Sequence, residues 1–203
     1  MKKVDLDTGK HNHFIGCWDI DDMNLFTGMI NFFEENSKQH IDGLVGHGKV
    51  DVNTKQSIDL TISPKMMAND NKYNIFNDYF SYLKKCYLSY LEDWELDKKW
   101  KVMDIGSFNI QKYNPGGHFK KWHWERETLA HAHRIFAWMT YLNDVEEGGS
   151  TDFRNFDLSI KPLTGRTLIW PAEWTHAHRG NIANEEKYII TGWLQFPFPN
   201  QTT

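Results

Sequence analysis

The stretch from Asn114 to Glu125, NPGGHFKKWHWE, decides the fold class of the second half of this chain. It opens with an Asn-Pro-Gly-Gly turn and continues as a candidate β-strand, in which side chains at alternate positions share a face. Because His123 and Glu125 are two positions apart, such a strand directs both to the same side. The stretch therefore predicts a turn and a strand that places His123 and Glu125 on one face, where both could bind one metal ion.

The sequence after Trp100 keeps this period of two. It is rich in β-branched and aromatic residues, and glycine-containing turns interrupt it at 147–149 and 163–165. Short strands separated by such turns are typical of a sheet sandwich or barrel. The candidate strands are residues 102–113, 118–125, 133–142, 157–161, 166–170, 175–179 and 186–196.

Two helical patterns precede these strands. From Asp22 to Asn36, apolar residues recur at steps of one and three, with Asp21 or Asp22 available as the N-cap. The same spacing follows Asn69 and continues to Trp94. We expect two amphipathic helices that bury one face against the sheet.

The remaining part of the first half has weaker signals. Residues 47–63 contain two short β-like stretches around a polar turn, which favours a hairpin at the edge of a pocket. Neither an internal repeat nor a linker is visible. We expect one domain over residues 1–203, in which residues 1–100 supply helical support and the hairpin, and residues 101–196 form the β core.

The composition narrows the partners and the compartment. The chain has 203 residues and a formal net charge of −4, so it lacks the basic surface that selects nucleic acid. Its apolar runs are too short to cross a membrane. Cys17 and Cys86 cannot form a disulfide framework, which favours a reducing, cytoplasmic setting. The oligomeric state is left open.

The His-x-Glu pair is a weak signal when taken alone. With 10 histidines and 27 acidic residues, chance supplies about 1.3 such pairs, and the chain also contains His40-Ile41-Asp42 in a loop-like segment. Two histidines and one carboxylate on one face of the metal are typical of non-haem Fe(II) oxygenases. A third ligand is therefore required. His176 and His178 are two positions apart and would lie on the same face of a strand, so periodicity does not choose between them.

The ordered set of motifs resembles the Fe(II)- and 2-oxoglutarate-dependent dioxygenases of the prolyl 4-hydroxylase-like type. Their pattern is His-x-Asp/Glu, a distal histidine, and a basic residue nine or ten positions later. Lys187 follows His178 by nine positions and His176 by eleven, so the resemblance favours His178. Further matching landmarks are Tyr113, Tyr141-Leu142-Asn143, Gly148-Gly149, Lys161-Pro162, Gly165-Arg166, Thr191 and Trp193.

The resemblance implies a double-stranded β-helix, or jelly roll, with an Fe(II) site at His123, Glu125 and His178. These three would be the catalytic residues. Lys187 would bind the far carboxylate of 2-oxoglutarate, and the other cosubstrate-pocket residues would be Tyr113, Tyr141, Thr191 and Trp193. Dioxygen would be the oxidant, with ascorbate as a candidate activator.

Independent of any family, the alternation Lys187, Ile189, Thr191, Trp193 places a cation and a hydroxyl on one wall of a pocket. Arg134 lies seven positions before Tyr141, so only a β-bulge would turn both inward. We leave the role of Arg134 open. His131, His133 and His176 are expected to be loop or supporting residues.

The implied reaction is oxidative decarboxylation of 2-oxoglutarate coupled to hydroxylation of an unactivated C–H bond. A peptidyl residue, above all proline, is the leading substrate class, and a free small metabolite is the alternative. A second alternative is a catalytically silent cupin-like binding module. A third keeps the jelly roll but uses zinc or manganese for isomerase or hydrolase chemistry, which would give Lys187 no dedicated role.

Overall fold

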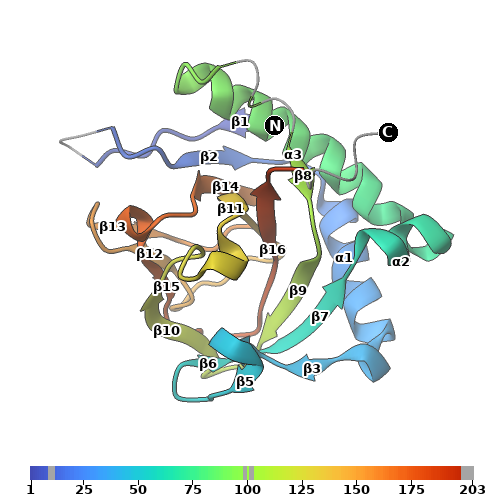
Figure 1. Ribbon diagram of the computed structural model, residues 1–203. Coiled ribbons are helices and arrows are strands. Elements are labelled where there is room, and N and C mark those ends of the chain that lie inside the picture. The colour runs from blue at the N-terminus through green and yellow to red at the C-terminus, as the bar shows by residue number, and fades with distance from the viewer. Residues whose placement is uncertain (9–11, 98–99, 101–102, 198–203) are drawn as a thin grey trace.

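The computed structural model describes residues 1–8, 12–97, 100 and 103–197 (Figure 1). Two antiparallel β-sheets pack together as a jelly roll. Every strand pair in both sheets is antiparallel, so the second half of the chain folds back and forth between them. The alternating pattern with its glycine turns predicted a sheet sandwich or barrel, and the family resemblance implied the jelly roll.

The larger sheet contains most of the long strands. Its order is β1 (Lys2–Lys3), β2 (Gly16–Asp19), β14 (Arg166–Pro171), β11 (Arg134–Tyr141), β16 (Lys187–Gln195), β9 (Phe108–Tyr113), β7 (Ile58–Ile62) and β3 (Ile41–Asp42), with β8 (Asp104–Ile105) paired to β16.

The smaller sheet faces the inner side of the larger one. Its order is β13 (Leu158–Ile160), β12 (Thr151–Phe153), β15 (His178–Gly180), β10 (His118–His123) and β6 (Lys55–Gln56). A separate two-stranded ribbon is formed by β4 (Leu44–Val45) and β5 (Lys49–Val50).

Helices cover the outer face of the larger sheet. The α-helices are α1 (Met23–Glu35), α2 (Pro64–Asn69) and α3 (Asn74–Asp93), and Figure 1 shows α1 and α3 running along that face. The short 3-10 turns are η1 (Ser37–Gln39), η2 (Gly46–Gly48), η3 (Asn71–Tyr73), η5 (Leu129–His131) and η6 (Trp174–His176).

The two predicted amphipathic helices are confirmed. Asp22 is the N-cap of α1, where its side chain accepts from the backbone N–H of Leu25 at 3.1 Å. The apolar stripes of α1 and α3 form one core with outward-facing rings of the sheet, including Phe108 and Trp138. The second helix begins later than expected, because Asp70 caps the turn η3 and separates α2 from α3.

A second core fills the space between the sheets. It is built from inward-facing side chains of β11, β14, β16 and the smaller sheet, among them Met139, Trp170 and Phe153. The two cores lie on opposite faces of the larger sheet. The inter-sheet core ends at a cavity, and its walls hold the candidate site.

The predicted hairpin over 47–63 is wrong in its pairing. Val50 pairs with Leu44, whereas residues 58–62 join the larger sheet beside β9, where they bury Leu60 and Ile62. The segment nevertheless lies at the edge of the cavity, as expected, because Thr54, Lys55, Asp59 and Thr61 line it.

Several strand limits also differ from the expectation. The segment 102–113 divides into β8 and β9 around Gly106, and its first residue lies outside the described residues. Residues 174–176 form a 3-10 turn before β15, and β10 ends at His123. Strands β2 and β12 were not predicted from the sequence.

Candidate metal and cosubstrate site

A cavity of about 410 Å³ lies between the two sheets. One wall is the inner face of β16, where Lys187, Ile189, Thr191 and Trp193 all line the space, as their alternation predicted. The facing wall carries His123 and His178 from the smaller sheet. The cavity therefore brings the predicted cation and the predicted metal-binding pair into one enclosure.

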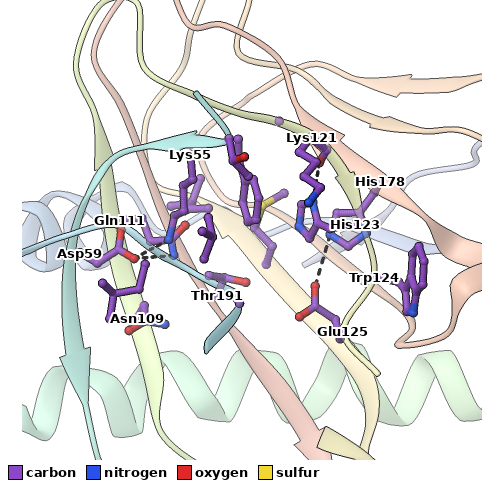
Figure 2. A pocket seen from close by; sticks show the side chains of 18 of the residues that line it. Lys55, Asp59, Asn109, Gln111, Lys121, His123, Trp124, Glu125, His178 and Thr191 are labelled. Atoms are coloured by element: carbon purple, nitrogen blue, oxygen red, sulfur yellow. Dashed lines mark hydrogen bonds and ion pairs between the residues drawn. The ribbon is translucent and has the colours of Figure 1, made fainter. Parts of the chain in front are cut away.

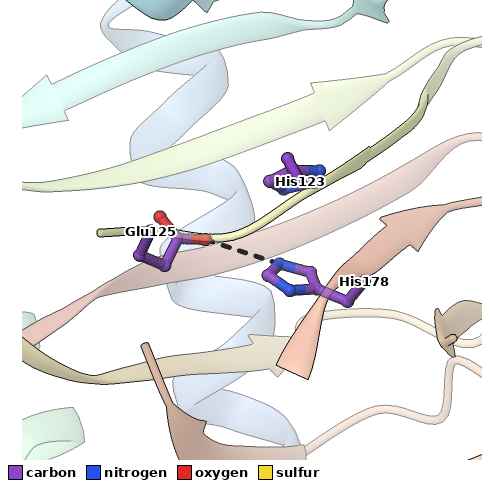
Figure 3. A group of neighbouring side chains, drawn as sticks. All are labelled: His123, Glu125 and His178. Carbon is purple, nitrogen blue, oxygen red and sulfur yellow. Dashed lines mark ion pairs between the residues drawn. The ribbon is translucent and has the colours of Figure 1, made fainter. Parts of the chain in front are cut away.

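His123, Glu125 and His178 converge at one end of this cavity (Figure 3). One potential ligand atom from each lies within 4.8 Å of the others. His123 ends β10 and His178 begins β15, and the two are direct cross-strand partners. Glu125 lies just beyond the strand, where its backbone N–H donates to the carbonyl of Ala172 at 3.2 Å.

Both histidines are oriented by the backbone. Nδ1 of His123 donates to the carbonyl of Lys121 at 2.9 Å, and Nδ1 of His178 donates to that of His176 at 3.0 Å. Since Nδ1 carries the proton in each ring, Nε2 of the neutral ring presents a lone pair. Burial, followed by the neighbouring His178, lowers the pKa of His123 to about 3, so this ring is neutral near pH 7.

The side chain of Glu125 is 13% exposed, and its carboxylate is ionised. Burial raises its pKa, but His178, His123 and a hydrogen bond from Trp193 outweigh burial and lower the pKa to about 2. Trp193 Nε1 donates to Oε2 at 2.7 Å, while Oε1 lies 3.4 Å from Nε2 of His178. With both imidazoles neutral, as metal binding requires, two nitrogen lone pairs and one anionic oxygen would serve as ligands, a donor set that suits Fe(II).

Arg134 reaches the same end of the cavity because β11 is irregular. The register with β16 shifts between Arg134 and Phe136, which is the bulge that the sequence required to turn Arg134 inward. Its guanidinium lies 3.5 Å from the centre of the Trp193 ring, and Nη1 is 3.9 Å from Oε2 of Glu125. Nε of Arg134 is buried and has no hydrogen-bond partner among the described residues.

Lys187 is buried at another position of the same wall, with a side chain that is 2% exposed. Its ammonium donates to the carbonyl of Gly149 at 2.9 Å and lies 4.5 Å from the centre of the Tyr113 ring. Gly149 adopts a positive φ of 67°, which presents this carbonyl to the ammonium. Burial lowers the pKa of Lys187 to about 8. Within the described chain, no carboxylate forms an ion pair with this cation.

Three of the four other predicted cosubstrate residues carry a hydroxyl group, and these hydroxyl groups point in different directions. Tyr113 lines the cavity, and its hydroxyl donates to Oε1 of Gln111 at 2.8 Å. Thr191 lines it as well and donates to the carbonyl of Trp138. Tyr141 lies behind the wall, where its hydroxyl donates to Oγ1 of Thr151 at 2.7 Å.

Several residues of the site were not predicted from the sequence. Phe119 stacks on His123 with ring centres 3.7 Å apart, and Trp170 packs edge-on against His178 at 4.9 Å. Phe119 shares parity with His123 on β10, so alternation could have identified it. Lys55 and Asp59 come from the segment 47–63, whose strand pairing was predicted wrongly. Their only signal in the sequence was an even spacing, which would place them on the same face of a strand.

The three histidines that were expected to be loop or supporting residues do not belong to the ligand cluster. Oγ1 of Thr175 lies 3.0 Å from Nδ1 of His176, and Nε2 of His176 lies 2.8 Å from the carbonyl of His13, so the ring points away from the cavity. His131 lines the cavity from η5, and His133 lies beside Arg134. These positions agree with supporting or loop roles.

Residues 108–195 match the family model of the 2OG-Fe(II) oxygenase superfamily. No curated protein sequence matches the chain significantly. Within the described residues, no helix is long and apolar enough to span a bilayer.

Solved structures share the fold over most of the chain. A Pseudomonas putida prolyl-4-hydroxylase is 14% identical, with a TM-score of 0.70 over 92% of this chain and 95% of that one. A Trichoplax adhaerens prolyl hydroxylase is also 14% identical, with a TM-score of 0.70 over 91% and 84%. A viral collagen prolyl hydroxylase from Paramecium Bursaria Chlorella virus-1 is 16% identical, with a TM-score of 0.62 over 94% and 98%.

Proposed function

We propose that this chain is a 2OG-Fe(II) oxygenase that hydroxylates a peptidyl residue, with proline as the leading candidate, because residues 108–195 match the model of that superfamily. Fe(II) would be held by Nε2 of His123, the carboxylate of Glu125 and Nε2 of His178. The main observation behind this proposal is that the three donors converge in one cavity. The same cavity holds the buried ammonium of Lys187, which has no carboxylate partner among the described residues.

Lys187 suits the far carboxylate of 2-oxoglutarate. A buried ammonium beside one carbonyl and one aromatic ring has gained little electrostatic compensation for its lost hydration. An incoming carboxylate supplies the missing charge, and the enclosed position makes this charge-assisted hydrogen bond strong. A zinc or manganese isomerase would leave this cation without a function.

When bound, ferrous iron supplies the dioxygen activation that couples the two half-reactions. One dioxygen is consumed: one oxygen atom enters succinate as 2-oxoglutarate loses carbon dioxide, and the other enters the new C–O bond of the substrate. The protein holds the ligands in place. Trp193 orients the Glu125 carboxylate, and the Lys121 and His176 carbonyls orient the two imidazoles.

A peptide substrate is supported by the solved relatives. One of them is described as a complex with a peptide fragment of a hypoxia-inducible factor degradation domain, and another as a collagen prolyl hydroxylase with 2-oxoglutarate. In this chain, the guanidinium of Arg134 lies beside the candidate metal ligands. Its Nε is buried and has no hydrogen-bond partner among the described residues. Arg134 would donate to an acceptor on the substrate.

We further infer that residues 1–203 act as one unit, because α1 and α3 pack against the outer face of the sheet whose inner face carries Lys187.

The test is succinate formation by the purified protein with Fe(II), 2-oxoglutarate, ascorbate and oxygen. Slow turnover without a primary substrate is expected, and His178→Ala should abolish it. His131→Ala is the matched control, since it removes a histidine that lines the cavity outside the ligand cluster. Firm metal binding with no succinate would instead favour the catalytically silent module.

A further inference from the structure

A second charged cluster lines the cavity away from the metal ligands. Lys55 on β6 and Asp59 on β7 form an ion pair between Nζ and Oδ2, and they are only 4% and 5% exposed. Figure 2 shows Lys55, Asp59, Asn109 and Gln111 gathered at one end, and His123, Glu125 and His178 at the other. Neither member of the pair belongs to the cluster of His123, Glu125 and His178.

Fold stability does not account for this pair. Replacing a buried ion pair by apolar residues of similar size is often neutral or stabilising, because desolvation offsets the attraction. The apolar residues of β7, Leu60 and Ile62, pack in the helix-covered core on the other face of the strand, so the charge of Asp59 is confined to the face that lines the cavity. A charged pair at the cavity wall is therefore better explained by what it contacts in the cavity.

The pair is held rigidly. Asp59 also accepts from the Ser57 hydroxyl at 2.7 Å and from Nε2 of Gln111 at 3.2 Å, and Gln111 in turn accepts from the hydroxyl of Tyr113. Asp59 and Gln111 are cross-strand partners in the β7–β9 register. The chain of hydrogen bonds thus fixes the direction of the carboxylate before any ligand arrives.

The charge balance distinguishes the two buried lysines. Lys187 has no carboxylate partner within the described residues, so it requires an anion. The charge of Lys55 is already balanced by Asp59. A second anion bound there would have no positive partner, whereas a neutral dipole needs none. The ammonium of Lys55 has three N–H donors, and Asp59 is its only hydrogen-bond partner in the described chain. Asp59 accepts three hydrogen bonds of the about four that a carboxylate can take.

These unused groups match a peptide group, which offers one acceptor and one donor and carries no net charge. We propose that Lys55 and Asp59 form a subsite for a main-chain amide of the primary substrate: the amide C=O accepts from Nζ of Lys55, and an amide N–H donates to the Asp59 carboxylate. This rests on the proposed function and narrows its substrate to an internal polypeptide segment. A free amino acid would bring two full charges that must be desolvated.

The subsite lies close to the reaction centre. Nζ of Lys55 is 5.7 Å from the centre of the Phe119 ring, and that ring stacks directly on His123. One aromatic ring therefore separates the ammonium from a metal ligand. An amide held at Lys55 belongs to the substrate backbone near the oxidised residue.

The experiment uses the Fe(II)-loaded protein and measures succinate release with 2-oxoglutarate and oxygen. The probes are N-acetylated, C-amidated pentapeptides with proline and other residues at the centre, compared with free L-proline and the other free amino acids. We expect blocked peptides to stimulate the wild type. The main variant is the double substitution Lys55→Met with Asp59→Leu, since removing one partner alone would leave an unpaired buried charge.

In the double variant, the factor by which the peptide KM rises should be at least about ten times the factor for the cosubstrate KM. This is the loss of affinity expected when a hydrogen bond to a charged group is removed. Lys55→Arg, which keeps the positive charge and N–H donors, should retain most of the peptide affinity. The polar double substitution Lys55→Gln with Asp59→Asn, which leaves no unpaired charge, is the second variant should the apolar one fail to fold, with an expected rise in peptide KM of about threefold or more. Lys120→Met is the matched control, because Lys120 is an exposed lysine of β10 outside the cavity lining.

The outcomes separate the subsite from the proposed function. Stimulation by free amino acids but not by blocked peptides overturns the subsite, and so does a wild-type peptide KM in the double variant. Succinate release that no peptide stimulates also overturns the subsite but leaves the oxygenase chemistry intact. An absence of succinate under all conditions overturns the proposed function itself.

Discussion

Replacing Lys187 with methionine should make the protein more stable while it removes 2-oxoglutarate binding. Burial lowers the pKa of Lys187 from the usual 10.5 to about 8. At about 1.4 kcal/mol for each pH unit, keeping this ammonium charged at neutral pH costs roughly 3 kcal/mol. Loss of its hydrogen bond to Gly149 offsets about 1 kcal/mol of the gain. The expected net gain is about 2 kcal/mol at pH 7.

The pH dependence gives the sign of the effect. The folded protein releases the Lys187 proton near pH 8, whereas the unfolded chain keeps it to about 10.5. Between these values the unfolded state binds more protons, so the wild type gains stability as pH rises. Methionine does not titrate. The advantage of Lys187→Met should therefore be full below pH 8 and shrink between pH 8 and 10.5.

Urea unfolding at pH 7 and pH 10, with and without 2-oxoglutarate and Fe(II), measures both effects. Lys112→Met is the control, because this lysine of the neighbouring strand β9 pairs with Glu34 and Glu186 and its removal should not stabilise the fold. A variant that is less stable than the wild type at pH 7, or one that 2-oxoglutarate still stabilises fully, would refute the reasoning.

Three further substitutions test neighbouring parts of the structure. Trp193→Phe removes the hydrogen bond that orients Glu125, so the dissociation constant for Fe(II) in anaerobic titration should rise about tenfold; an unchanged constant would show that the indole does not orient the ligand. Arg134→Met should raise the KM for a stimulating peptide about tenfold, and a change confined to cosubstrate affinity would place Arg134 at 2-oxoglutarate instead. Tyr79→Phe breaks the buried hydrogen bond to Thr140, so the free energy of unfolding should fall by about 1 kcal/mol, and a weaker Fe(II) affinity would contradict its remote position.

The sequence predicted the parts of this fold that depend on local periodicity. The helix after Asp22 and the inward alternation of Lys187, Ile189, Thr191 and Trp193 follow from the spacing of side chains alone. The choice between His176 and His178 did not, because both have the same strand parity. In the structure, residues 174–176 form a 3-10 turn that directs the His176 ring away from the cavity.

Pairing between distant strands was harder to predict. The segment 58–62 alternates like a hairpin strand, but its partner is β9, about fifty residues away, and no local signal specifies that partner. The inward direction of Arg134 depends on a bulge, which appears only in the register of β11 with β16. The Lys55–Asp59 pair was missed for the same reason, since it becomes a cavity wall only after β6 and β7 have joined different sheets.

Two of the nine tryptophans touch the candidate iron ligands: Trp193 hydrogen-bonds Glu125, and Trp170 packs on His178. Intrinsic fluorescence should therefore report metal loading directly, because a paramagnetic ion at this distance quenches indole emission. The protein thus carries its own optical probe, and ferrous titrations can be followed without a label or a chromogenic chelator.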